Sequence, residues 1–157
     1  IFFYVGSDVV YRAPWAPAVP DSPYAKPLNE CLLPSLFRDV CSFAEFPLIG
    51  QETRDPSHAD IMDRLVVSHP WMAERFEQVL PMLPPDLILL MRSLRAITIG
   101  ANTRPSFYDA NAAAMHLDAD VLWFTREERE TISTDPDYRA EFAKLVDFAD
   151  QIGRAHV

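Results

Sequence analysis

Apolar residues recur at helical spacing in the middle of the chain. Ser57 and Asp60 have the spacing of a capping box, and the apolar positions after them predict a helix that continues to about Val67. Pro70 suits the first position of a second helix, which carries an apolar stripe. A pair of prolines then opens the very apolar stretch 84–94, which predicts a third helix that is buried. The middle of the chain is therefore predicted to be helical.

Alternating patterns replace the helical spacing after this region. Residues 95–99 are rich in β-branched side chains and alternate in polarity, which predicts a strand. Residues 104–108 and 113–117 predict two further strands, and the composition of 109–112 is typical of an Asx turn between them. These segments predict a small antiparallel sheet or hairpin.

Two more helices are predicted after the hairpin. Thr125 and Glu128 repeat the capping-box spacing, which predicts a short helix to about Ile132. Asp135 starts a last helix. The apolar stripe of that helix consists of Tyr138, Phe142, Leu145 and Phe148. A helical middle followed by a small sheet and two helices places the fold in the α+β class.

The first third of the chain is rich in proline. Seven of the fourteen prolines lie between residues 14 and 47, where they fix backbone angles and end helices. Residues 1–12 alternate weakly and predict one strand ahead of this region. We therefore expect residues 1–54 to form an extended, proline-rich arm and residues 55–150 to form an α+β domain.

The two cysteines of the chain, Cys31 and Cys41, are ten positions apart within the arm. A bridge between them would close a short loop and stabilise the fold by roughly 2–3 kcal/mol. A bridge favours an oxidising compartment, and therefore a secreted, periplasmic or envelope protein. The alternative is a pair of unpaired, buried cysteines in a cytosolic protein, because the spacing is not that of a zinc site.

Composition narrows the classes of partner. The 157 residues are 49% hydrophobic, which is enough for the core of one domain. The formal net charge of -9 opposes phosphate backbones and anionic lipids, so we expect no nucleic-acid partner. No run of about 20 apolar residues predicts a transmembrane segment, and no H-E-x-x-H, G-x-S-x-G or glycine-rich phosphate loop is present. The composition is compatible with a protein or peptide partner, and it does not define the oligomeric state.

Both ends of the sequence have unusual features. Residues 151–157, Q-I-G-R-A-H-V, match the translation of a common sequencing-library adapter, and the first residue is Ile1 rather than methionine. We expect residues 151–157 to be a non-native tail and the chain to be a fragment of a larger, metagenomic gene product. A domain that is incomplete at its C-terminal end is expected to leave apolar surface exposed.

One polar constellation has the spacing of a metal site. His116, Asp118 and Asp120 form H-x-D-x-D, which places three side chains on one face of an extended strand, as metal ligands require. Met115 and Leu117 would occupy the opposite face, so the pattern also fits an ordinary half-solvated strand whose exposed positions are polar. Asp118 and Asp120 are equally suited to cap a turn at 121–124. His116, Asp118 and Asp120 are therefore candidate metal ligands, and no catalytic residue is assigned.

The strand and hairpin segments resemble part of a known family. Residues 96–99, then R-P-S-F-Y-D-A-N at 104–111 and A-M-H-L-D at 114–118, resemble zincin-like metallopeptidases, in which a strand, a phrase containing F-Y-D and an edge strand precede the helix with H-E-x-x-H. The resemblance implies a secreted or envelope protein whose zinc-binding helix follows the present C-terminus. It also implies a strand that pairs with the substrate backbone. The residues of that strand are Ala113, Ala114, Met115, His116 and Leu117.

Two functions follow from these expectations. The first is the upstream scaffold and substrate strand of a secreted zinc peptidase, with zinc held by the full-length parent and the fragment itself inactive. The second is a non-enzymatic envelope module that binds a partner or has a structural role. Residues 61–150 also resemble uncharacterised bacterial envelope proteins, and that resemblance implies no particular activity.

Overall fold

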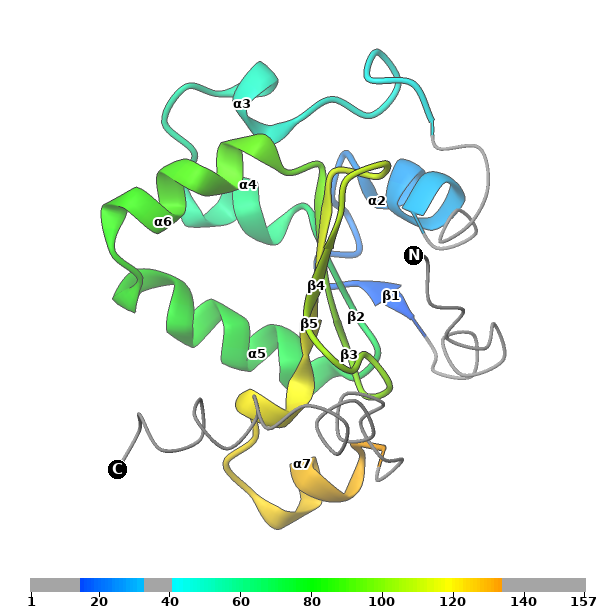
Figure 1. Cartoon of the computed structure of the whole chain (residues 1–157), viewed down its shortest axis with the longest axis vertical. Coiled ribbons are helices and arrows are strands. Elements are labelled where there is room, and N and C mark those ends of the chain that lie inside the picture. Colours follow the sequence, from blue (N-terminus) through cyan, green and yellow to red (C-terminus); the bar gives the residue numbers. More distant parts are fainter. Residues whose placement is uncertain (1–14, 33–40, 134–157) are drawn as a thin grey trace, which may run out of the picture.

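The computed structural model describes residues 15–32 and 41–133, and its centre is a five-stranded mixed sheet. Along the sheet the strands follow the order β1-β2-β3-β5-β4 (Figure 1). The inner strands β2, β3 and β5 run parallel, while β1 and β4 are antiparallel to their neighbours. The strands are β1 (Ala16–Pro17), β2 (Leu65–Val67), β3 (Ala96–Gly100), β4 (Phe107–Asp109) and β5 (Ala114–Asp118).

Short helices connect and cover the strands. Figure 1 shows α5 and α6 on one side of the sheet and α2 on the other. The helices are α2 (Ala25–Pro27), which continues into a π-helical turn (Leu28–Leu32), α3 (Ile49–Glu52), α4 (His58–Met62), α5 (Pro70–Val79), α6 (Pro85–Leu90) and α7 (Arg126–Glu130). Turns of 3-10 helix are Leu80–Met82, Met91–Ser93 and Ala119–Val121. The α+β class is confirmed, with a sheet that is mixed rather than purely antiparallel.

Several predictions fall outside the described residues. These are the strand in 1–12, the helix that starts at Asp135 and the tail 151–157. In the part of the chain that is described, none of the helices has the length and apolar character needed to cross a bilayer.

The helix predicted from Ser57 to Val67 is wrong in its second half. The hydroxyl of Ser57 accepts a hydrogen bond from the amide of Asp60 as predicted, but α4 ends at Met62. Leu65–Val67 instead form β2, an inner strand with three buried side chains. A three-residue apolar run has no distinctive period, so its pairing with β3 decides its conformation.

The third predicted helix is present but is not buried. α6 contains no buried residue, and Leu87, Leu89 and Leu90 are 44%, 50% and 65% exposed. The apolar content of a helix indicates that other residues should pack against it, but it does not identify those residues. The prediction of burial is therefore wrong for this helix among the described residues.

The proline-rich region packs against the sheet instead of extending from it. β1 pairs with β2, and Leu28, Leu32 and Phe46 are buried in one hydrophobic cluster with Val66. Residues 25–32, which were expected to be extended, are helical. The predicted Cys31–Cys41 disulfide is present and joins the two described parts of this region.

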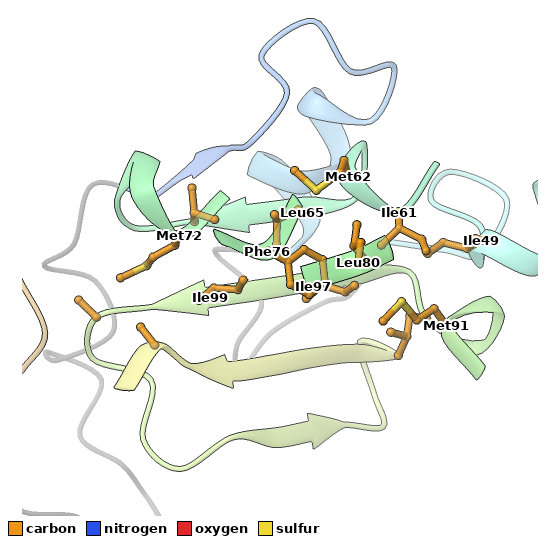
Figure 2. Packing of buried hydrophobic residues seen from close by; sticks show 14 of the residues in the cluster. Ile49, Ile61, Met62, Leu65, Met72, Phe76, Leu80, Met91, Ile97 and Ile99 are labelled. Atoms are coloured by element: carbon orange, nitrogen blue, oxygen red, sulfur yellow. The ribbon is translucent and has the colours of Figure 1, made fainter. Parts of the chain in front are cut away.

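Alternation along the inner strands sends side chains into two hydrophobic clusters. Those on the α5 side pack against the helices (Figure 2), and those on the opposite side pack against the N-terminal region. The first cluster includes Leu65, Val67, Phe76, Leu80, Ile97 and Ile99, and the second includes Leu28, Leu32, Phe46, Val66, Ala96 and Ala114.

Two arginines at the beginnings of β2 and β3 are fully buried. Arg64 precedes β2 and Arg95 precedes β3, and each is 1% exposed. Arg95 donates hydrogen bonds to the carbonyl oxygens of Cys41, Ser42 and Phe46. Arg64 donates to the carbonyl oxygen of the next residue, Pro47, at 2.7 Å. Both guanidinium groups thus hold one short segment, residues 41–47, against the sheet.

Aromatic rings complete the surroundings of these two guanidinium groups. Arg64 lies 3.3 Å from the ring centroid of Tyr24, and Arg95 lies 4.6 Å from that of Phe43. Neither arginine forms an ion pair within residues 15–32 and 41–133, and burial lowers the pKa of each from the ordinary arginine value. The carbonyl oxygens and ring faces therefore stabilise charges that would otherwise be costly to bury.

We predict that Arg95→Met lowers the free energy of unfolding by about 3 kcal/mol, because carbonyl oxygens in residues 41–46 lose their donor. Chemical denaturation of the oxidised protein measures the loss. Arg126→Met is the matched control, since the Arg126 side chain is 88% exposed and should contribute less than about 0.5 kcal/mol. Equal stability of the two variants would contradict the role assigned to Arg95.

Candidate functional site

The β4–β5 hairpin forms one edge of the sheet and is fixed at both ends by side chains. The carboxylate of Asp109 accepts a hydrogen bond from the amide of Asn111 at 2.9 Å, which confirms the predicted Asx turn. At the other end, Ser106 Oγ accepts from the amide of Asp118 at 2.8 Å. Ala113, between the turn and β5, has a φ of 48°. The hairpin is therefore held in one register by local hydrogen bonds.

The inner position of β5 excludes the substrate role predicted for residues 113–117. β5 pairs in parallel with β3 on one side and antiparallel with β4 on the other. The carbonyl oxygen of Ala113 is also occupied, since it accepts from the amide of Arg95 at 2.8 Å. A second strand cannot add to backbone that is paired on both sides. The prediction for Ala113 to Leu117 is therefore wrong, and β4 is the edge strand.

His116 lies on the buried face of β5. It is 4% exposed, its Nδ1 is 2.7 Å from the hydroxyl oxygen of Thr98, and its ring stacks on that of Phe107 with the centroids 4.4 Å apart. Within residues 15–32 and 41–133, its Nε2 has no hydrogen-bond partner. The interpretation of β5 as a half-solvated strand with exposed polar positions is therefore wrong at His116, because its neighbours cover that face.

Burial lowers the pKa of His116 to about 4, and the carboxylate of Asp109 opposes this shift only in part. The ring is therefore neutral at pH 7. A neutral ring that stacks on Phe107 and bonds to Thr98 supports the position of β4 beside β5.

Asp118 and Asp120 belong to an ion-pair network at the end of β5. Asp118 caps the turn Ala119–Val121 by accepting from the amide of Asp120 at 2.9 Å, so the predicted capping role is found for Asp118, but at this turn and not at 121–124. Arg104 lies 3.4 Å from the carboxylate of Asp118 and 3.0 Å from that of Asp120. Arg129, close to the end of α7, lies 3.4 Å from Asp120. The network ties the loop after β3 and α7 to the end of β5.

This geometry does not fit a metal ion at His116, Asp118 and Asp120. The imidazole is covered by Phe107, whereas a cation between the two carboxylates would be repelled by the adjacent guanidinium groups. Within the described ranges, no group of three or more histidine, cysteine, aspartate or glutamate side chains is placed to hold a metal. We assign no reaction step to these residues.

The edge strand β4 presents one aromatic side chain to each side of the sheet. Phe107 stacks on His116 and is still 46% exposed, while Tyr108 borders the opposite face and is 54% exposed. Large exposed aromatic side chains on a sheet edge are typical of recognition surfaces rather than of a solvated strand. The sequence pattern predicted a strand at 104–108, which overlaps β4 only at Phe107 and Tyr108, and it did not show that the strand lies at the edge.

An apolar groove adjoins Tyr108 on the α5 side of the sheet. Its volume is about 550 Å³, and one wall is formed by helical segments while the other is formed by β4, β5 and the turn after β5. The lining residues are Phe76, Val79, Leu83, Leu87, Leu90, Met91, Ser93, Leu94, Tyr108, Met115, Leu117, Val121 and Leu122. Sequence analysis missed the groove because it predicted that α6 is buried.

Comparison with known proteins adds no relative: neither a protein-family model, nor a curated protein, nor a solved structure matches this chain. Its function is therefore inferred from its own geometry.

We predict that His116 makes the fold sensitive to mild acid. The pKa of His116 is depressed in the folded state, so its contribution to stability is complete above about pH 6.5 and is lost as the pH falls towards 4. The loss approaches roughly 3 kcal/mol at the acid end of this window. Denaturant unfolding at pH 7, 6 and 5 measures it.

His116→Gln should remove most of this pH dependence, whereas His58→Gln, at an exposed position, should retain it. His69→Gln is a necessary second control, because burial also lowers the pKa of His69. Parallel pH profiles for the wild type and His116→Gln would contradict the prediction.

Proposed function

We propose that this chain binds an extended peptide segment along the outer side of β4. The observation that carries the proposal is an antiparallel edge strand that exposes Phe107 and Tyr108. A peptide in extended conformation would add to the sheet as a sixth strand, with main-chain hydrogen bonds to β4 and alternate side chains on its two faces.

The rigidity of the hairpin supports this function. Asp109, Ser106 and the pairing of β5 with both neighbours hold the edge before any partner arrives. Little conformational entropy is then lost on the protein side when a peptide binds. Three residues of edge offer few main-chain hydrogen bonds, so we expect a dissociation constant of ~0.1–1 mM for a short peptide.

Comparison of the two edges supports the choice of β4. β1 spans two residues, and one of them is Pro17, which has no amide hydrogen to donate. β4 spans three residues without proline. The net charge of -9 favours neutral or basic peptides over acidic ones.

The disulfide supports an extracytoplasmic site of action. Cys31–Cys41 joins residues that contact the sheet, and such bridges persist in oxidising compartments. We therefore infer a periplasmic, envelope or secreted location, where extended or unfolded segments of other proteins are the available peptides.

Peptide addition at β4 predicts a specific NMR response. A capped octapeptide of alternating valine and threonine should shift the amide resonances of Phe107, Tyr108 and Asp109, while those of β1 stay unchanged. The fully N-methylated peptide has the same side chains but no amide hydrogens, so it should produce no such shift.

Tyr108→Pro should weaken binding at least about tenfold by removing an edge amide, while Phe124→Ser, at another exposed aromatic position, should leave it unchanged. Both variants are checked for an unaltered unfolding transition. Equal binding of the methylated peptide, or shifts confined to β1, would exclude addition at β4.

The second candidate is the upstream scaffold of a zinc peptidase. It is favoured by one feature, an antiparallel edge strand in the segment that resembles this family, although the strand concerned is β4 and not residues 113–117. The zinc ligands would then come from an H-E-x-x-H helix beyond the described residues, and the edge would hold the substrate backbone.

The peptidase candidate predicts about one zinc ion per chain in the full-length gene product and no dependence of that zinc on His116. Mass spectrometry of metal content, with the wild type and His116→Ala compared, measures both. Absence of zinc from the full-length product would exclude the peptidase and leave the binding module. Loss of zinc in His116→Ala would instead show that the H-x-D-x-D residues bind metal.

A further inference from the structure

The apolar groove marks a part of the sheet that the described helices do not cover. α5 packs over β2 and β3, where the side chains of Leu65, Val67, Ile97 and Ile99 are all at most 5% exposed. β5 and β4 lie farther along the sheet, and there Met115 and Leu117 are only partly buried. The hydrophobic layer on this side is therefore incomplete over the last two strands.

Both walls of the groove expose large apolar side chains. Leu87 and Leu90 of α6 are 44% and 65% exposed, Val121 is 79% exposed, and Tyr108 is 54% exposed. Ser93 is the one lining residue with a polar side chain apart from the Tyr108 hydroxyl. A surface of this composition requires an apolar cover, since a stable protein rarely leaves such a patch in water.

The described chain ends beside the same hydrophobic cluster. The amide of Ser133 donates to the carbonyl oxygen of Ala101 at 2.9 Å, and Ile132 is buried in the cluster that contains Phe76, Met91 and Leu94 of the groove. Residues 134–137 can extend up to about 14 Å from Ser133. Residue 138 can therefore be at most about 18 Å from Ser133, whose neighbour Ile132 belongs to the cluster that contributes Phe76, Met91 and Leu94 to the groove.

Residues 138–148 have the pattern that the groove requires. Tyr138, Phe142 and Leu145 repeat at helical spacing, and Phe148 continues the stripe. Arg139 and Lys144 lie off the stripe and would remain in water, whereas Glu141 lies at the edge of the stripe beside Phe148. In helical form the segment would measure ~16 Å, which matches the ~17 Å of the five-residue strand β5.

We propose that residues 138–148 pack in this groove and complete the hydrophobic layer over β5 and β4. The stripe contacts Leu87 and Leu90 on one wall and Met115 and Leu117 on the other. The outer side of β4 stays open, so this packing is compatible with peptide addition there and does not depend on it.

Two single substitutions on the stripe test the packing. In the full chain, Phe142→Asp and Leu145→Asp should each increase the fluorescence of a hydrophobic dye several-fold, because the groove loses its cover. Ala143→Asp introduces the same charge off the stripe and should leave the signal at the wild-type level. An equal signal from all three variants would overturn the proposal.

A spin label measures the contact directly. With a nitroxide on Ala140→Cys, which lies off the stripe, the methyl resonances of Leu90 and Met115 should broaden, while those of Leu28 on the opposite face of the sheet should not. A mixture of labelled, isotope-free chains with unlabelled, isotope-enriched chains should show no broadening. Broadening confined to that mixture would identify a second copy of the chain as the occupant of the groove. An absence of broadening in both samples would show that residues 138–148 do not occupy the groove. Either result would overturn the proposal.

Discussion

The fold depends on two buried positive charges that stand at the beginnings of adjacent parallel strands. The guanidinium groups of Arg64 and Arg95 lie in the N-terminal region. Carbonyl oxygens of residues 41–47 accept hydrogen bonds from them there. An uncompensated charge in this environment would be strongly unfavourable, so the position of the segment and the position of the strands are coupled. The Cys31–Cys41 disulfide links that segment to the π-helical turn on the same face. One face of the sheet is thereby fixed by charge, aromatic rings and a covalent bond rather than by apolar burial alone.

The opposite face has a different organisation and is uneven along the sheet. Over β2 and β3 it is covered by α5 and the turn that follows it, where Phe76 and Leu80 respectively pack in one cluster with the isoleucines of β3 (Figure 2). Over β5 and β4 it opens into an apolar groove. The hairpin itself is rigid, because Asp109 and Ser106 fix its ends and His116 stacks under Phe107. A rigid edge strand beside an open apolar surface is a combination suited to recognition, since the edge gives main-chain pairing and the groove gives apolar contact. In the two proposals, a peptide binds to the edge strand β4, and residues 138–148 of the same chain pack in the groove.

The candidate site shows which structural features can be predicted from a sequence and which cannot. The Asx turn at Asp109 was predicted correctly, and Asp118 was correctly predicted to be a cap, although of an earlier turn, because each role depends on a side chain that bonds to backbone within three residues. The H-x-D-x-D spacing was equally visible, but its meaning depended on residues far away. Arg104 and Arg129 neutralise the two carboxylates, and Thr98 and Phe107 enclose the imidazole. Spacing along a strand could not reveal those neighbours, so it could not separate metal ligands from a structural network.

By itself the sequence determined the α+β class, the beginnings of α4, α5 and α7, and the hairpin. It favoured a Cys31–Cys41 bridge over two unpaired cysteines, and the structure contains that bridge. These features arise from local capping, turn formation and short-range bridging, whose partners are close in sequence. Tertiary structure alone decided that Leu65–Val67 is a strand, that β5 is an inner strand while β4 is the edge, and that α6 is exposed. Each of these depends on which distant segment lies alongside, as when Val66 pairs with Thr98 and Thr98 with His116. A short apolar run is compatible with helix or strand, and with burial or exposure, until such a neighbour provides the missing hydrogen bonds and contacts.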